Sequence, residues 1–334
     1  MRNWTERRRL CARKNKCFFT IHSVCMEQQY DTPRTPKHVK WTGVYPAVTT
    51  KFTEHGDLDI PAFLHNIEAQ AAAGVTGIII GGSLGESSTL NHDERIALAE
   101  AVLAAAGDRV EVILNIAEGS TRQAIALAQR AEKAGIDGLM LLPPMMYKPT
   151  AVEVTEFFCT VAKATSLPIL LYNNPVDYKI EITPDMFEAF VPFDNLQAVK
   201  ESTRDISNVT RMRNRFGNRF RILCGVDTLA MEELLMGADG WVAGLVDAFP
   251  RETVALYNLI RAGRVEEALM LYRWFMPLLE LDISPQLVQN IKLAEAMTGL
   301  GNEYVRLPRQ PLRGVERERV VAILEKGLAT RPNV

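Results

Sequence analysis

Eight short apolar runs alternate with longer segments of helical periodicity from about residue 41 onward. The runs are continuously hydrophobic, which is typical of parallel strands that are buried on both faces. They occupy residues 44–48, 77–81, 111–115, 138–142, 168–172, 196–200, 221–224 and 240–243. Eight consecutive strand–helix units are the count of a closed α/β barrel. We therefore predict a (β/α)8 TIM barrel over residues 41–263.

The segments between the strands carry helix signals. Asn91 followed by Glu94 is a capping-box pattern, and Ser120 and Thr183 precede two further helical stretches. After residue 264 the periodicity is purely helical, over 265–281, 285–298 and 314–328, and no Gly/Ser-rich linker separates these stretches from the barrel. We expect residues 264–334 to form C-terminal helices packed on the barrel. An open doubly wound sheet is the alternative, but the first turn, VTTKFTEHG, lacks the usual glycine-rich phosphate loop.

The N-terminal segment differs from the rest in charge. Residues 1–40 hold ten Lys and Arg against three acidic residues, whereas the whole chain has a formal net charge of −2. We predict a basic, disordered extension over residues 1–40, with a transit peptide or an electrostatic anchor as alternatives. The near-neutral balance gives no indication of a nucleic-acid partner, and the apolar runs are shorter than the roughly 20 residues that cross a membrane. Cys159 and Cys224 fit buried free thiols of a cytoplasmic protein.

Lys200 stands at the end of the sixth predicted strand, where an α/β barrel places its reactive groups. Period-two alternation puts Leu196, Ala198 and Lys200 on the same side of that strand, facing the barrel interior. Burial lowers the pKa of a lysine, and the free amine can then attack a carbonyl and form a Schiff base. The alternative is a structural lysine paired with an acid such as Glu86 or Glu201.

Two other strand ends carry groups that suit such chemistry. Tyr172 ends the fifth strand, where its phenol could shuttle protons, although a core tyrosine with a satisfied hydroxyl is equally consistent with the sequence. The turn after the second strand presents successive backbone N–H groups that could bind a carboxylate or phosphate; it contains Gly82, Ser83, Leu84, Gly85 and Glu86. All five histidines precede residue 93 and none ends a strand, so we expect no histidine-based metal centre and no Ser-His-Asp triad.

From Trp41 to the C-terminus, these motifs together resemble those of the dihydrodipicolinate synthase/N-acetylneuraminate lyase family of class I Schiff-base lyases. The resemblance implies that Lys200 forms the Schiff base, that Tyr172 transfers protons and that the turn binds the carboxylate of a 2-oxo acid. It extends to VRLP at residues 305–308, and it implies a homotetramer and a reaction that needs no metal and no organic cofactor. Further catalytic or substrate-binding positions implied by it are Gly82, Ser83, Leu84, Gly85, Glu86, Asn174, Asp177 and Val242.

Three departures from the family pattern concern the substrate. Dihydrodipicolinate synthase usually has Thr-Thr where this chain has Ser83 and Leu84. Its relay tyrosine, donated across a subunit interface, falls at Met146, with Tyr147 one position on. The arginine that binds the carboxylate of its aldehyde substrate falls at Asp177, which argues against aspartate semialdehyde as co-substrate. Asp177 could instead bind a neutral or cationic distal group, or merely cap the loop.

Longer strings point to one branch of the family. LPPMMY, LYNNPVDYK, VKESTRD, GLVDAFP and WFMPLLELD resemble the branch that deaminates 1-pyrroline-4-hydroxy-2-carboxylate to 2-oxoglutarate semialdehyde and ammonia. We expect this activity, on a small-molecule substrate. The alternatives are a pyruvate-dependent aldolase or 4-hydroxy-tetrahydrodipicolinate synthase-like enzyme, a 2-keto-3-deoxy sugar acid dehydratase or aldolase, and a non-catalytic barrel that binds a 2-oxo acid.

Overall fold

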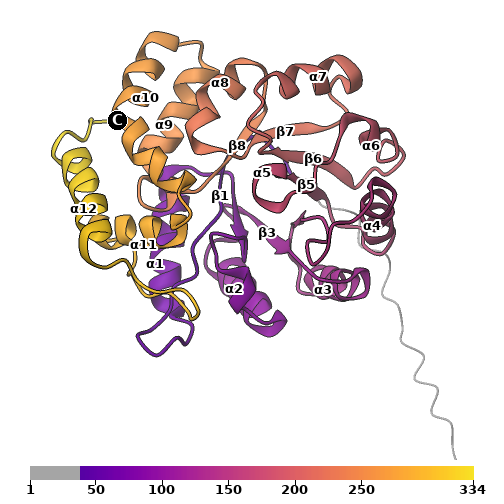
Figure 1. Ribbon diagram of the computed structural model, residues 1–334, viewed down its shortest axis with the longest axis horizontal. Coiled ribbons are helices and arrows are strands. Elements are labelled where there is room, and N and C mark those ends of the chain that lie inside the picture. Colours follow the sequence, from indigo (N-terminus) through magenta and orange to yellow (C-terminus); the bar gives the residue numbers. More distant parts are fainter. Residues whose placement is uncertain (1–37) are drawn as a thin grey trace, which may run out of the picture. The chain divides into compact units, whose positions relative to one another are not determined.

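The structure, a computed structural model, describes residues 38–334 and contains one eight-stranded parallel sheet (Figure 1). Neighbouring strands follow the order β1-β8-β7-β6-β5-β4-β3-β2. The ring closes between β1 and β2, where Ala47 bridges Ile79 and the Val48 N–H donates to the Ile79 carbonyl at 3.1 Å. The predicted (β/α)8 TIM barrel is confirmed. The strands are β1 (Gly43–Pro46), β2 (Gly77–Ile80), β3 (Glu111–Ile116), β4 (Gly138–Leu141), β5 (Ile169–Asn173), β6 (Leu196–Glu201), β7 (Arg221–Cys224) and β8 (Gly240–Ala243).

Helices surround the strands and begin where local signals predict. The Asn91 side chain accepts from the Glu94 N–H while the Glu94 carboxylate accepts from the Asn91 N–H, and Ser120 caps the next helix. Thr183 precedes a helix but makes no side-chain capping bond. The barrel helices are α1 (Ile60–Ala73), α2 (His92–Ala106), α3 (Thr121–Lys133), α4 (Ala151–Lys163), α5 (Pro175–Tyr178), α6 (Pro184–Glu188), α7 (Ser207–Phe216), α8 (Ala230–Leu235) and α9 (Pro250–Arg261). Short 3-10 turns are η1 (Ser87–Thr89), η2 (Asp227–Leu229) and η3 (Leu245–Asp247).

Two apolar layers hold the barrel together, one inside the ring of strands and one between strands and helices. Ala198 belongs to the inner layer, but Leu196 packs in the outer one, so the predicted common face of Leu196 and Lys200 is wrong. The reason is a register shift, since Ile169 pairs with Leu196 whereas the next residue, Leu170, pairs with Ala198. The extra residue breaks strict alternation at the start of β6. The inner layer contains Val39, Trp41, Tyr45, Ala47, Ile79, Ile113, Met140, Leu142, Leu170, Tyr172, Ala198, Leu223 and Val242.

The folded part begins before residue 41. Val39 is buried in the inner layer, and the Lys40 N–H donates to Glu111 Oε1 at 3.2 Å. The folded part therefore begins a few residues before the predicted boundary at residue 41. The reason is that Val39, which precedes the first strand, packs inside the ring of strands. The rest of the predicted basic extension, residues 1–37, lies outside the described residues.

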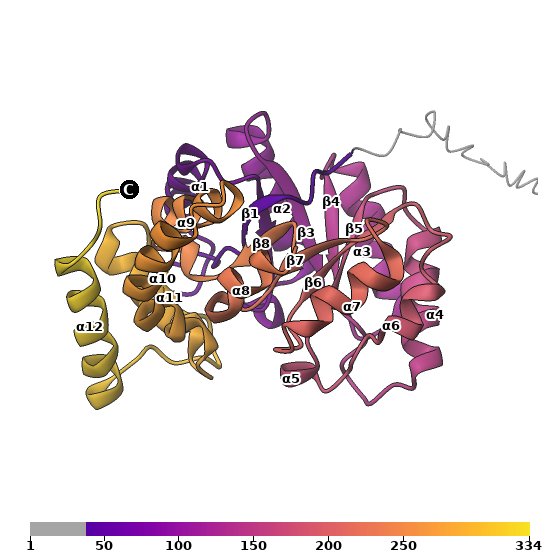
Figure 2. The ribbon, with the colours of Figure 1, turned by 90° about the horizontal axis from the view of Figure 1, so that it is seen from above.

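The C-terminal helices pack beside α9 and α1, as both ribbon views show (Figures 1 and 2). They are α10 (Val265–Leu279), η4 (Glu280–Ile283), α11 (Leu287–Thr298) and α12 (Gly314–Ala329). Trp274 Nε1 donates to the Gly327 carbonyl at 3.3 Å, and Arg331 pairs with the buried Glu252 of α9. These contacts tie the last helices to each other and to the barrel.

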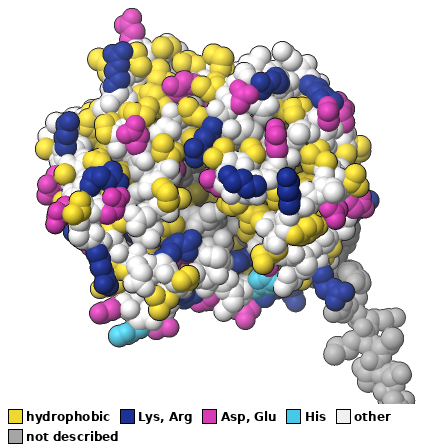
Figure 3. All heavy atoms as spheres, in the orientation of Figure 1, with side chains coloured by type: hydrophobic (Ala, Val, Ile, Leu, Met, Phe, Trp, Pro, Cys, Tyr) yellow, Lys and Arg dark blue, Asp and Glu magenta, His cyan; other side chains and the backbone are white. Residues whose placement is uncertain are grey.

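The surface carries charges of both signs, and the cysteines of the described residues are buried. Lys and Arg side chains stand among Asp and Glu side chains on the face drawn in Figure 3. Cys159 and Cys224 are buried free thiols, as predicted. No helix within residues 38–334 is long and apolar enough to cross a lipid bilayer.

Candidate active site

A cavity of about 430 Å³ lies at the carboxyl ends of the strands. Polar groups reach it from β5, β6, the turn after β2 and the segment between α10 and α11. Its polar and glycine lining consists of Gly82, Ser83, Tyr172, Asn174, Asp177, Tyr178, Lys200, Ser202, Arg204, Gly225, Gly244, Asp282 and Ser284. The predicted residues Leu84 and Val242 also line it. The two strand ends and the first part of the turn are thus brought together, as the sequence predicts.

Lys200 projects into this cavity from β6 and is 7% exposed. Its backbone pairs with that of Tyr172 on β5, and its Nζ lies 4.2 Å from the centroid of the Tyr172 ring. Glycine at position 225 leaves room for the lysine stem, since an added Cβ would stand 2.8 Å from Lys200 Cε. Burial lowers the pKa of Lys200, while Tyr178, Asp282 and Asp227 act in the opposite direction. A buried amine with a lowered pKa is the kind of group that can act as a nucleophile.

Tyr172 presents its ring to the lysine and its hydroxyl to Asn174. The Asn174 Nδ2 donates to the Tyr172 hydroxyl at 3.1 Å and to Asp177 Oδ2 at 2.7 Å. Burial raises the pKa of Tyr172 to about 12, so the phenol is protonated at neutral pH. Asn174 thereby links a proton donor beside Lys200 to a carboxylate on the exposed rim.

The turn after β2 contributes only its first half to the cavity. Gly82, Ser83 and Leu84 line it, whereas Gly85 and Glu86 do not. The Glu86 N–H donates to the Ser83 carbonyl, and within residues 38–334 no acceptor faces the N–H of Ser83 or Leu84. These free amides suit a carboxylate.

Glu86 points away from the cavity, so its expected contact with substrate is wrong. Its backbone is left-handed, with φ of 57°, which turns the fully buried side chain toward the C-terminal helices. There Glu86 Oε1 accepts from Lys292 Nζ at 2.6 Å, and Oε2 accepts from the Arg306 N–H at 3.0 Å. Gly85 is also wrong as a contact, because it does not line the cavity and an added Cβ would stand 2.8 Å from the Val48 carbonyl oxygen. The VRLP segment, through the backbone of Arg306, thus binds the turn after β2 on the side that faces away from the cavity.

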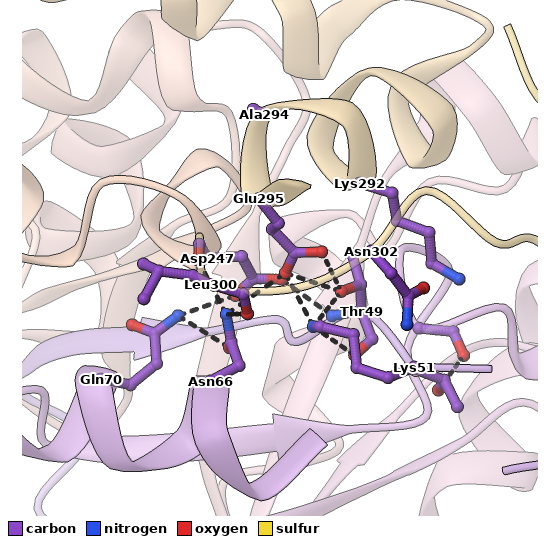
Figure 4. A network of polar contacts seen from close by, with 12 residues as sticks. Thr49, Lys51, Asn66, Gln70, Asp247, Lys292, Ala294, Glu295, Leu300 and Asn302 are labelled. Carbon is purple, nitrogen blue, oxygen red and sulfur yellow. Dashed lines mark hydrogen bonds and ion pairs between the residues drawn. The ribbon is translucent and has the colours of Figure 1, made fainter. Parts of the chain in front are cut away.

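A second buried network lies next to this anchor (Figure 4). Lys51 and Glu295 are both fully buried and form an ion pair of 2.8 Å, to which Thr49 adds a hydrogen bond. Asn66 donates to the Asp247 carbonyl and Gln70 to the Asp247 carboxylate. The network joins the end of β1, α1, η3 and α11.

Removing one member of this network should weaken the fold. We expect Glu295→Ala to lower the free energy of unfolding by about 3–5 kcal/mol, because the Lys51 ammonium would remain buried without its partner. Urea unfolding measures the loss. The control is Glu267→Ala, since Glu267 pairs with Arg264 at an exposed site where ion pairs contribute about 1 kcal/mol or less. Equal effects of both substitutions would contradict the expectation.

Tyr178, Arg204 and Asp282 line the cavity, although no pattern in the sequence marks them as site residues. Tyr178 ends α5, six positions after Tyr172, in the string LYNNPVDYK. Arg204 follows β6 in the VKESTRD string. Asp282 lies in η4, outside the barrel segment, where no strand-end rule applies. Glycine at 244 makes room for it, since an added Cβ would stand 2.7 Å from Asp282 Cγ.

The positions expected for a relay tyrosine donated across an interface lie outside the cavity of their own chain. Met146 is 81% exposed and Tyr147 is 53% exposed.

Among residues 38–334, no three His, Cys, Asp or Glu side chains are grouped so that they could hold a metal ion.

The chain is similar in sequence and in fold to known synthases. The chain is 34% identical over 290 residues to a 4-hydroxy-tetrahydrodipicolinate synthase of Bartonella bacilliformis, covering 85% of this chain and 97% of that protein. The structure of the corresponding synthase of Methylacidiphilum fumariolicum matches with a TM-score of 0.82 and 32% identity, over 86% of this chain and 96% of that one. A dihydrodipicolinate synthase of Acinetobacter baumannii in complex with pyruvate matches with a TM-score of 0.82 and 25% identity, over 86% and 98% of the two chains.

These relatives carry the name of the synthase, which is the alternative activity, and not the name of a deaminase, which is the expected one. The sequence profile of the Dihydrodipicolinate synthetase family matches residues 40–327. The chain belongs to this family of class I lyases.

Proposed function

We propose that this protein forms a Schiff base between Lys200 and a small 2-oxo acid or cyclic imino acid. The buried Lys200 amine, which opens into a cavity beside the unpaired amides of Ser83 and Leu84, is the observation that carries the proposal. The amides suit the substrate carboxylate, which would place C2 next to the amine. The pyruvate complex of the Acinetobacter relative supports a 2-oxo acid as one ligand.

For the substrate, we propose 1-pyrroline-4-hydroxy-2-carboxylate. Asp177 of α5 and Asp282 of η4 both line the cavity, and the charges of Asp282 and Lys200 interact. Two carboxylates would repel a second substrate carboxylate and favour the ammonium that ring opening releases at C5. Burial and the neighbouring Asp227 raise the pKa of Asp282, so this carboxyl could also donate a hydrogen bond to a neutral distal group.

The proposed reaction uses Lys200 as the electron sink. Nζ adds to ring C2, the bond from C2 to the ring nitrogen breaks, and a Schiff base and a free C5 amine result. The Schiff base acidifies C3, a proton leaves C3 by way of Tyr172 or a water, and the 4-hydroxyl takes up a proton and departs as water. Tautomerisation gives a C5 imine, and hydrolysis of both imines releases 2-oxoglutarate semialdehyde, ammonia and Lys200. The sum is substrate plus one water, and no cofactor enters it.

A synthase-like or aldolase reaction on pyruvate is the second candidate. The names of the relatives favour it, and so does Arg204, which lines the cavity and could bind a second carboxylate. Lys200 would form the same covalent intermediate in this reaction.

Borohydride trapping tests the class, and product analysis separates the candidates. The protein would be incubated with pyruvate or with the pyrroline, reduced with borohydride, and its mass measured. An adduct on Lys200 with ammonia release from the pyrroline supports the deaminase. An adduct with pyruvate alone, followed by condensation with an aldehyde, supports the second candidate. Lack of any adduct with either compound would remove the Schiff-base proposal and leave a binding protein.

Substitution of Asp177 tests the charge preference of the cavity. We expect kcat/KM for the pyrroline to fall about tenfold in Asp177→Asn and further in Asp177→Arg, because a favourable charge is first lost and then reversed. The Arg variant should gain weak binding of dicarboxylates. Asp185→Asn is the control, since Asp185 is an exposed member of a surface ion pair. Equal activity of all variants would show that Asp177 does not face the substrate.

We also propose a homotetramer, on the family resemblance alone. The mass of the protein in solution at micromolar concentration tests this, and a fully active monomer would contradict it.

A further inference from the structure

We propose that Ser83 and Tyr178 form a proton-transfer pair within one chain, so that the site needs no tyrosine from a neighbouring subunit. The proposal rests on the Schiff-base chemistry of Lys200 proposed above. It assigns to Tyr178 the role of the family's relay tyrosine. The position of that tyrosine is occupied here by Met146, which has no ionisable proton.

The two hydroxyl groups are joined directly. Ser83 Oγ and the Tyr178 hydroxyl are hydrogen-bonded to each other, and both residues line the cavity that contains Lys200. The Tyr178 ring meets the Tyr172 ring edge to face, with centroids 5.6 Å apart. Two phenols from one β5–α5 segment therefore stand beside the same amine.

The backbone fixes Tyr178 in this position. Asn174 caps the short helix α5, and its carbonyl accepts from the Tyr178 N–H at 3.1 Å. The next residue, Lys179, is left-handed with φ of 60° and ends the helix. Asn174 also binds the Tyr172 hydroxyl, so one residue orients both phenols.

The charges around Tyr178 suit a group that gives up a proton and takes it back. Burial raises its pKa, and Tyr172 and Asp177 act in the same direction, so the phenol is protonated at neutral pH. Lys200 and the hydrogen bond with Ser83 act in the opposite direction by stabilising the phenolate. A cationic imine on Lys200 would favour the phenolate in the same way.

The transfer balances without any additional reagent. Once Lys200 has added to C2, the leaving group on C2 is the hydroxyl of a 2-oxo acid or the ring amine of the pyrroline. Ser83 gives its proton to this group and receives the Tyr178 proton, so the C2 bond to the leaving group breaks and an iminium forms beside a phenolate. The Tyr178 phenolate then takes back a proton through Ser83, namely the proton that leaves C3 by way of Tyr172 or a water, which gives the neutral enamine and restores the phenol.

The first experiment compares rates of adduct formation. Tyr178→Phe and Ser83→Ala should each slow formation of the borohydride-trapped adduct by about 10²-fold or more, whereas Ser83→Thr should retain most of the rate because it keeps the hydroxyl. The probes are pyruvate and the pyrroline. Tyr147→Phe is the control, since Tyr147 is exposed and adjoins Met146. Loss in Tyr147→Phe with none in Tyr178→Phe would overturn the proposal in favour of a relay from another subunit.

The second experiment mixes subunits. Chains carrying Lys200→Ala and chains carrying Tyr178→Phe are unfolded together, refolded and assayed. A pair that acts within one chain predicts no gain, because every site keeps one defect. Recovered activity would mean that Tyr178 acts across an interface and would overturn the proposal. If the wild-type protein traps no adduct, the Schiff-base function itself fails; a wild-type adduct with an unchanged rate in Tyr178→Phe removes only the relay.

Discussion

Lys200→Ala is expected to abolish turnover and the borohydride-trapped adduct while leaving the protein folded. Alanine removes the only group proposed to bond to C2, and the lost stem lies at the cavity and not in the apolar layers. Since the pKa of Lys200 is lowered by burial, adduct formation by the wild-type enzyme should reach its plateau at a lower pH than the ordinary pKa of lysine implies.

Intact-mass analysis after reduction and circular dichroism check this result. Lys326→Ala, an exposed lysine of α12, is the control and should keep full activity. An adduct that still forms on the Lys200→Ala protein would show that another amine is the nucleophile.

Tyr172→Phe is expected to lower kcat by about 10²–10⁴-fold with little change in KM. The phenylalanine ring keeps the contact with Lys200 Nζ at 4.2 Å, so the space beside the amine stays filled. What disappears is the hydroxyl that Asn174 orients and that provides a proton at neutral pH.

Steady-state kinetics, with the substrate that the borohydride experiment identifies, measure kcat and KM separately. Tyr304→Phe serves as the control, because Tyr304 is exposed and its ring is not in the cavity lining. An unchanged kcat would reduce Tyr172 to a packing residue and leave Tyr178 as the one phenol with a chemical role.

Lys200 and Tyr172 could be predicted because a strand end in a parallel barrel is a fixed place, and the sequence marks it by an apolar run that stops at a polar residue. Glu86 could not be interpreted correctly. Its side-chain direction depends on a left-handed backbone and on a lysine more than two hundred residues later. Asp282 could not be predicted either, because its place in the site depends on contacts between distant parts of the chain. Only the folded chain brings η4 to the cavity at the carboxyl ends of the strands.

Tyr178 is a different kind of omission. It lies in a string that resembles the family, but that resemblance directs attention to Met146 for the relay. The hydrogen bond between Tyr178 and Ser83 forms across segments 95 residues apart, and only a structure reveals it.

The buried ion pairs limit how such a chain can be recombined in evolution or in the laboratory. Lys51 and Glu86 belong to the barrel, whereas Glu295 and Lys292 belong to α11, and all four are fully buried. A chimaera that joins this barrel to the last helices of a relative with other residues at these positions would enclose lone charges. Each such mismatch costs several kcal/mol. Crossovers are therefore expected to succeed only where they exchange both halves of each pair, so the helical segment is inherited with its barrel.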